Sequence, residues 1–162
     1  MPLNPDMPCK TENARKILVL ADTHNHLPVN LATLVEGAGE IWHLGDVCAE
    51  HLLDELHIIG LPVTIVRGNC DDNSKWPLVV DCTRNGVRFR LQHIPPTRAP
   101  ANCDVLLHGH THVPRNEMID GVRFLNPGCV TRPNRGAPAS VAYLTIRASG
   151  ELEWQLIPLP KR

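Results

Sequence analysis

Three short apolar segments in the first half of the chain each run into a polar, glycine-containing or histidine-containing loop, and this pattern restricts the fold most. The segments are residues 17–21, 41–44 and 62–66. Continuous apolar runs with β-branched members fit strands that are buried on both faces. Asn30 is placed to cap a short helix over residues 31–35, which Gly37 and Gly39 end, and the spacing of residues 50–56 predicts a second helix. Strands that alternate with helices predict a parallel sheet with helices outside it.

The second half of the chain is dominated by hairpin signals. Asn85-Gly86 and Asp120-Gly121 are two-residue turns, and Ala148-Ser149-Gly150 is a longer one. The flanking runs are 78–83 with 87–91, 118–119 with 122–125, and 141–146 with 151–157, and residues 105–108 form a further buried strand. We therefore predict an α/β fold in which two mixed β-sheets pack face to face with helices outside. Residues 1–15 are predicted to be a flexible lead-in, and residues 16–162 a single domain.

Composition excludes several classes of protein. A net charge of −1 over 162 residues gives no broad basic surface for nucleic acid. No run approaches the roughly 20 apolar residues that span a bilayer, and residues 1–16 contain no apolar stretch of a secretory signal. A cytoplasmic location is expected, and the six cysteines, which form no C-x-x-C pair, are expected to be reduced thiols. Nine histidines against one tyrosine are unusual, because imidazole is the commonest transition-metal ligand.

Side chains suited to metal binding lie at or just beyond the ends of the predicted strands. They are Asp22, His24, Asp46, Asn69, His93, His110 and His112. Because sites in open α/β sheets form outside the carboxyl ends of strands, the five loops that carry them can converge. Neighbouring glycines allow sharp turns and close approach. Within Asp22-x-His24 and His110-x-His112, alternate residues of an extended segment would point the same way.

This donor set has two carboxylates, four imidazoles and one amide. Mixed nitrogen and oxygen ligands suit Mn, Fe, Zn, Ni or Co. Seven ligands exceed the need of one ion, but they can hold two ions if a carboxylate bridges them. Two ions roughly 3.5–4 Å apart can clamp the attacking and leaving oxygens of a displacement at phosphorus.

The same residues, in order and spacing, resemble the motifs of the calcineurin-like metallophosphoesterases, especially their small single-domain phosphodiesterases from bacteria and archaea. The matching blocks, between Ile17 and the end, are Asp22-Thr23-His24, Gly45-Asp46, Gly68-Asn69-Cys70-Asp71, residues 104–112 and Asn126-Pro127-Gly128-Cys129. The resemblance implies a four-layer α/β/β/α sandwich and two divalent transition-metal ions, with Mn²⁺ favoured over Ni²⁺, Fe²⁺, Zn²⁺ or Co²⁺. Asp22, His24 and His112 would hold the first ion. Asn69, His93 and His110 would hold the second, and Asp46 would bridge the two.

The activity that the resemblance implies is hydrolysis of a phosphodiester by a hydroxide that bridges the ions. Asp46, Asn69 and His110 would be catalytic. Asn69 and Cys70 would contact the substrate, a small phosphodiester or nucleotide-like molecule. Two divalent ions, two carboxylates and a hydroxide leave one positive charge, which suits a diester. Many relatives outside this branch have histidine where this chain has Cys70, a poor proton donor, so we predict a preference for good leaving groups.

Several alternatives remain open. A eukaryotic retromer subunit of the same fold has a degraded site, so a non-catalytic metal-binding scaffold is one, although all seven ligands are kept here. A phosphomonoesterase or nucleotidase is another. The short segment between His93 and Asp104 lacks the helix that the family has there. His43 and His108 are interpreted as hydrogen-bonded core or near-site residues. Arg67 and Arg132 are interpreted as surface cations that could instead contact phosphate. No membrane partner is expected, and a homo-oligomer is left open.

Overall fold

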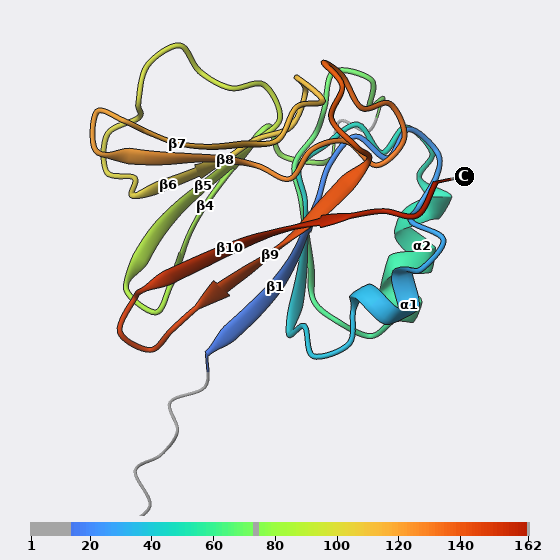
Figure 1. Ribbon diagram of the computed structural model, residues 1–162, viewed down its shortest axis with the longest axis horizontal. Helices are drawn as coiled ribbons and strands as arrows, with labels where there is room; N and C mark the ends of the chain where they lie inside the picture. The colour runs from blue at the N-terminus through green and yellow to red at the C-terminus, as the bar shows by residue number, and fades with distance from the viewer. Residues whose placement is uncertain (1–13, 73–74, 162) are drawn as a thin grey trace, which may run out of the picture.

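The computed structural model describes residues 14–72 and 75–161, which form two five-stranded mixed sheets packed face to face (Figure 1). The first sheet has the strand order β10-β9-β1-β2-β3, and the second has the order β4-β5-β6-β8-β7. The prediction of two packed mixed sheets is confirmed. Residues 1–13 of the predicted lead-in lie outside the described residues, and β1 begins at Arg15, one residue before the predicted start of the domain.

Three parallel strands form one half of the first sheet. They are β1 (Arg15–Leu20), β2 (Glu40–His43) and β3 (Val63–Ile65), joined through α1 (Leu31–Leu34) and α2 (His51–Ile58). β3 is half-buried because it is the edge strand, whereas β2 is buried along its whole length. The predicted cap on α1 is wrong, because the Asn30 side chain makes no capping hydrogen bond. This single turn is held instead by Leu34, which packs against the sheet.

The three predicted hairpins are present. They are β4 (Val79–Arg84) with β5 (Val87–Gln92), β7 (Arg115–Ile119) with β8 (Val122–Asn126), and β9 (Ser140–Ile146) with β10 (Leu152–Pro158). Between the first two hairpins lies β6 (Val105–Leu107), which is parallel to both β5 and β8. The third hairpin belongs to the first sheet, because β9 pairs antiparallel with β1.

Apolar side chains from the two sheets meet in the main core. Trp42 and Phe89, from opposite sheets, pack edge to face with their ring centroids 5.3 Å apart. The Trp42 indole donates a hydrogen bond to Glu40 Oε2 at 2.9 Å, so its polar edge is satisfied.

The two helices of the described residues lie on the same side of the sandwich. Figure 1 shows α1 and α2 on the outer face of the first sheet, where Leu34 and Leu56 pack against its apolar side chains. On the second sheet, Cys103 and Ala99 from the short segment after His93 pack against Leu106 and Phe124 instead of a helix. The described part of the chain therefore has one helical layer and two sheets, and an irregular segment takes the place of the helical layer expected outside the second sheet. Neither of its two helices has the length and apolarity needed to cross a membrane.

Candidate metal centre

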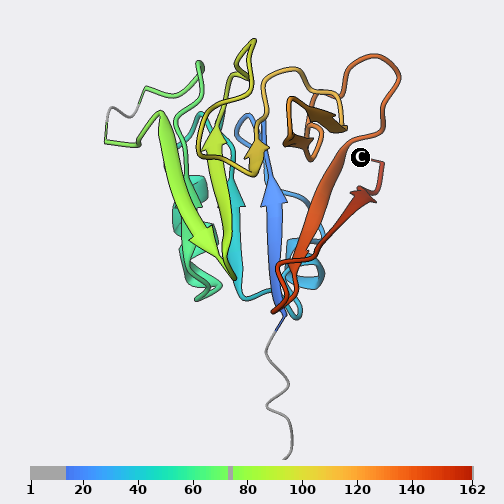
Figure 2. The same cartoon turned by 90° about the vertical axis from the view of Figure 1, so that its left-hand side faces the viewer.

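The loops after β1, β2, β3, β5 and β6 carry all seven predicted ligands, and the strands end at the same edge of the sandwich (Figure 2). The structure brings the seven side chains together. His112 Nε2 lies 3.3 Å from Asp22 Oδ1, and His93 Nε2 lies 3.3 Å from Asp46 Oδ2. His24 Nε2 lies 3.9 Å from both of these carboxylate oxygens.

The remaining two ligands meet at an amide oxygen. Asn69 Oδ1 lies 2.9 Å from His93 Nε2 and 2.9 Å from His110 Nδ1. On the other side of the centre, the Nε2 atoms of His24 and His112 are 3.4 Å apart. The donor atoms thus form one continuous cluster, because His93 Nε2 also lies 3.8 Å from Asp22 Oδ1, and Asp22, Asp46 and His93 together could hold a metal ion.

One carboxylate oxygen in the centre accepts no hydrogen bond from the described residues, although imidazole nitrogens lie near it. Asp22 is fully buried, and its Oδ1 has no hydrogen-bond partner among the described residues. Its Oδ2 accepts a hydrogen bond from the His110 amide at 3.1 Å. A buried anion without a donor is costly unless a cation compensates it.

The hydrogen bonds of two imidazoles also indicate that the centre can bind a cation. Nδ1 of His93 donates to the Leu44 carbonyl at 2.7 Å, so its Nε2 faces only acceptors, Asn69 Oδ1 and Asp46 Oδ2. Nδ1 of His112 likewise donates to the Arg132 carbonyl at 2.7 Å. Hydrogen bonds of this kind orient metal-binding histidines. The residues therefore fit divalent ions with mixed nitrogen and oxygen ligands.

The charges in the centre are strongly coupled. Burial raises the pKa of Asp22 to about 6, against the opposing effect of His93 and His112. Burial would also raise the pKa of Asp46, but hydrogen bonds from His93 and from the Cys70 amide outweigh it and hold that pKa well below its usual range. Burial would lower the pKa of His93, yet the two carboxylates raise it. Asp46 is thus held as an anion beside a site that favours positive charge.

Five of the seven ligands have a left-handed backbone conformation. They are Asp22, His24, Asp46, His110 and His112, with φ between 41° and 69°. The expectation that D-x-H and H-x-H would be extended is therefore wrong, because β1 and β6 end before these motifs. Backbone hydrogen bonds of 3.0 Å from Asp22 to Gly45 and from His24 to Asp46 hold the turns in place. Asp and His tolerate this region better than most residues, and such strain gathers at functional sites.

Glycine is required where the loops touch. A Cβ on Gly68 would lie 2.1 Å from Asp46 Oδ1 and 2.3 Å from the Asp46 amide. Gly45 has a φ of +95°, and a Cβ there would lie 2.8 Å from the Gly68 amide. The close approach predicted from the neighbouring glycines is confirmed.

Asp71 is a positioning residue to which the sequence analysis gave no role. Its Oδ2 accepts hydrogen bonds from the amides of Asp46 (2.9 Å) and Gly68 (2.7 Å), and its Oδ1 accepts one from the Cys48 amide at 2.8 Å. One buried carboxylate therefore ties together the loops that carry Asp46 and Asn69. Its place in the motif, two residues after Asn69, was the available signal.

Asn126 has a comparable role for the loop that holds His110 and His112. It is fully buried, and its Nδ2 donates to the Gly109 carbonyl and to Thr111 Oγ1, both at 3.1 Å. Its Oδ1 accepts from the Gly128 amide at 2.9 Å. The Asn-Pro-Gly turn noticed in the sequence thus supports the metal-binding loop.

Two further histidines belong to the supporting structure. His43 accepts a hydrogen bond from the Gly45 amide at 3.1 Å and contacts Thr23 Oγ1 at 3.0 Å, and burial lowers its pKa to about 4. His108 lies 3.3 Å from an Arg115 nitrogen, and burial lowers its pKa to about 4 as well. Both are neutral core residues, in agreement with their interpretation from sequence.

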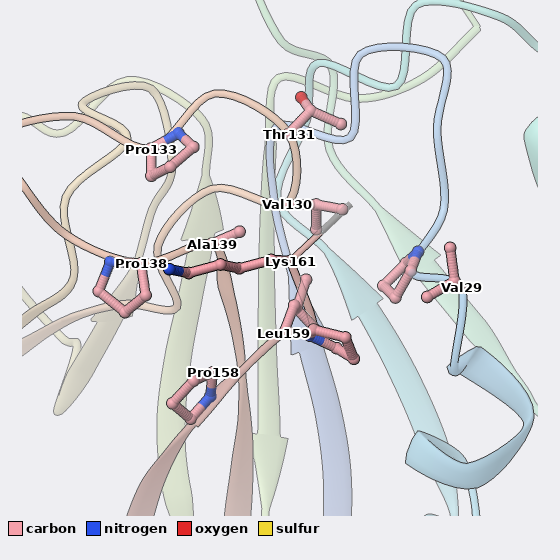
Figure 3. Close-up of a pocket in the computed structure, with 11 residues that line it drawn as sticks. Val29, Val130, Thr131, Pro133, Pro138, Ala139, Pro158, Leu159 and Lys161 are labelled. Atoms are coloured by element: carbon pink, nitrogen blue, oxygen red, sulfur yellow. The ribbon is translucent and has the colours of Figure 1, made fainter.

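A separate cavity of about 610 Å³ lies between residues 28–29, the 130–139 segment and the end of β10 (Figure 3). Proline, valine, alanine and leucine side chains form most of its wall, and the Lys161 side chain extends across the view towards Pro138. None of the seven predicted ligands lines it. The groups capable of metal chemistry are therefore in the centre described above and not in this cavity.

Comparison with known proteins agrees with the geometry. The family model of the calcineurin-like phosphoesterase superfamily domain matches residues 16–149. Phosphodiesterase YfcE of Escherichia coli is 33% identical over 147 residues, which cover 81% of this chain and 72% of that protein. Probable metallophosphoesterase YsnB of Bacillus subtilis is 25% identical, over 80% of this chain and 83% of its own length.

Solved structures share the fold. The structure of E. coli YfcE, described as a phosphoesterase, superposes with a TM-score of 0.71 at 24% identity and covers 90% of this chain and 100% of that one. Vacuolar Protein Sorting 29 from Cryptosporidium parvum has a TM-score of 0.70 at 22% identity, over 91% and 99% of the two chains. The match over residues 16–149 and the 33% identity with YfcE together show that the chain belongs to the calcineurin-like phosphoesterase superfamily.

Proposed function

We propose that this chain is a phosphodiesterase that uses two divalent transition-metal ions, with Mn²⁺ as the favoured ion. One observation carries the proposal. The carboxylates of Asp22 and Asp46 lie 3.3–3.9 Å from imidazole nitrogens, and Asp22 Oδ1 has no other partner among the described residues. Family membership supports phosphate-ester chemistry, and the name of the E. coli relative supports a diester substrate.

Each ligand has a stated place in this proposal. Asp22, His24 and His112 would hold one ion, and Asn69, His93 and His110 the other. Asp46 would bridge them, because its Oδ2 lies between His24 and His93. Bound divalent ions would supply Lewis-acid charge and lower the pKa of water towards neutrality.

Residues at the entrance of the centre would orient the substrate. Asn69 and Cys70 are exposed beside the buried carboxylates, so they can reach a phosphate that sits at the centre. The Cys70 amide donates to Asp46 Oδ1 at 2.8 Å, which fixes the backbone at Cys70 beside the centre. Burial and the nearby Asp46 raise the pKa of the Cys70 thiol, so it remains a weak proton donor at neutral pH.

Metal analysis combined with parallel ester assays tests the proposal. Wild type should contain close to two ions per chain after loading and hydrolyse bis-(p-nitrophenyl) phosphate faster than p-nitrophenyl phosphate. Asp46→Asn should lose at least one ion and most activity, because the amide removes the bridging charge. Asp104→Asn removes a carboxylate that pairs with Arg88 outside the centre, and this variant should keep the wild-type metal content and activity.

Three results would contradict parts of the proposal. Unchanged turnover in Asp46→Asn would remove that residue from the mechanism. A preference for the monoester would favour a phosphomonoesterase. Bound metal without turnover of either ester would favour a non-catalytic metal-binding protein of the same fold.

A further inference from the structure

A cavity of about 490 Å³ adjoins the metal centre on the side of His110, and we call it the His110 cavity. Its polar wall consists of His108, His110, Thr111, Arg115, Asn134 and Arg135. None of the described residues that line it is acidic. Because His110 belongs to both, a molecule bound at the centre can extend directly into this cavity.

Arg115 is held in a defined position in the cavity wall. Its guanidinium lies 4.7 Å from the centre of the Phe124 ring and 3.3 Å from His108 Nε2. It also pairs with Glu117, a residue that does not line the cavity. Stacking on Phe124 and the contacts with His108 and Glu117 hold the guanidinium in place, and Glu117 balances its charge, so Arg115 offers the cavity positioned N–H groups and no additional net charge.

Arg135 is the cation of the cavity wall that has no ion-pair partner among the described residues. Within residues 14–72 and 75–161, its guanidinium makes no ion pair or side-chain hydrogen bond. The loop that carries it is fixed to the centre, because the Asn134 amide donates to the His112 carbonyl at 3.1 Å and His112 Nδ1 donates to the Arg132 carbonyl. The unpaired charge is therefore kept near the metal centre and not on a remote part of the surface.

The opposite side of the centre has different chemistry. A second cavity of about 480 Å³ shares Asn69 and His93 with the centre. Three apolar side chains form its rim, Leu78, Val79 and Ile94, which are 58%, 43% and 51% exposed. Among the described residues that line it, Arg67 is the single arginine and is accompanied by the carboxylate of Asp71, so they give the second cavity no excess of positive charge. A phosphodiester carries two organic groups on its phosphorus, which we call its ester arms. The two cavities beside the centre would give these arms different surroundings.

We propose that the His110 cavity binds one ester arm of the substrate and that this arm carries an anionic group of its own, such as a second phosphate. The proposal rests on the phosphodiesterase function proposed above and narrows its substrate class to diesters with a charged arm. Arg135 and Arg115 contact the second anion, while the scissile phosphate remains at the centre. Paired arginines suit phosphate because the guanidinium can donate two hydrogen bonds at once.

Two substrates that differ only in one arm provide the test. Thymidine 5′-(p-nitrophenyl phosphate) and its 3′-phosphorylated derivative release the same p-nitrophenolate, so any difference comes from the 3′-phosphate. The Mn²⁺-loaded wild type should show a KM about five- to tenfold lower for the phosphorylated substrate, the size of one or two partly exposed charged contacts. Arg135→Gln should reduce this ratio below about twofold, and Arg135→Lys should restore part of it.

Arg147→Gln is the matched control. It removes the same charge at the far end of β9, where Arg147 lies 3.8 Å from Glu151 and 3.7 Å from Glu153, and it should keep the wild-type ratio. Calorimetric titration with thymidine 3′,5′-bisphosphate and thymidine 5′-monophosphate gives a second readout that needs no turnover. The bisphosphate should bind wild type about five- to tenfold more tightly, and this difference should shrink in Arg135→Gln.

The possible failures can be told apart. Equal KM values for the two diesters would overturn the charged-arm proposal and leave the phosphodiesterase intact. A preference that survives unchanged in Arg135→Gln would also overturn it, because the second phosphate would then be bound elsewhere. If neither diester is hydrolysed, the proposed function fails, and equal affinity for the two nucleotides would then reject the cavity as an anion site as well.

Discussion

Replacement of Asp71 by asparagine should loosen the metal centre without removing any ligand. The carboxylate accepts three backbone hydrogen bonds of 2.7–2.9 Å, and Asp71 is only 8% exposed. An asparagine oxygen can still accept from Asp46 and Gly68, but its amide group would then face the Cys48 amide. One hydrogen bond becomes a donor–donor contact, and the other two are then accepted by a neutral amide oxygen and no longer by a charged carboxylate. Hydrogen bonds to charged groups contribute about 1.5–3 kcal/mol each, so we expect a loss of about 3 kcal/mol.

The assay is thermal and urea unfolding of the metal-free protein, which separates this loss from any loss of metal. About 3 kcal/mol corresponds to a midpoint roughly 6–12 °C lower for a chain of this size. Metal titration should then show weaker binding, because the loops with Asp46 and Asn69 are no longer tied together.

Asp104→Asn is the control for this experiment. Asp104 also receives three N–H contacts, all from Arg88, but its side chain is 42% exposed. Water screens such a pair, so the midpoint should change by no more than about 2 °C. Equal midpoints for the Asp71 and Asp104 variants would refute the reasoning.

Three further predictions concern the space, the ions and the chemistry of the centre. Gly68→Ala should lose metal and activity, because its Cβ would lie 2.1 Å from Asp46 Oδ1. Gly39→Ala should keep the metal and the activity, because the nearest atom to its Cβ is Lys16 O at 3.8 Å. Equal metal contents in the two variants would contradict this prediction. Addition of Mn²⁺ at about 100 times its Kd should stabilise the folded chain by about 2.7 kcal/mol for each bound ion, and a chelator should reverse this in scanning calorimetry; an unchanged midpoint would argue against the site. Hydrolysis rates should fall steeply as the pKa of the leaving group rises, because Cys70 is a weak proton donor. Rates that do not depend on this pKa while chemistry limits turnover would reject the weak assistance assigned to Cys70.

Local sequence patterns were sufficient for the secondary structure and for most of its order. The apolar run before Asp22 predicts a buried strand, and Asn85-Gly86 predicts a tight hairpin, because each signal is contained within a few neighbouring residues. The seven ligands could be identified for a related reason. Metal-binding residue types at the ends of successive strands can meet only if those ends converge, and parallel strands make them converge.

The backbone conformation of the ligands, their supporting residues and the cavity beside them depend on contacts between distant segments. The left-handed backbone at Asp22 and His112 depends on hydrogen bonds from loops that are distant in sequence, so no local pattern indicates it. Asp71 is a positioning residue only because three amides from two loops point at it. The arginines of the His110 cavity are separated in the chain and become one surface only when the 130–139 segment folds over β7 and the loop before it. The residue types that could do chemistry follow from local sequence, whereas their distances, charges and neighbours follow from long-range packing, because those depend on contacts that no short segment contains.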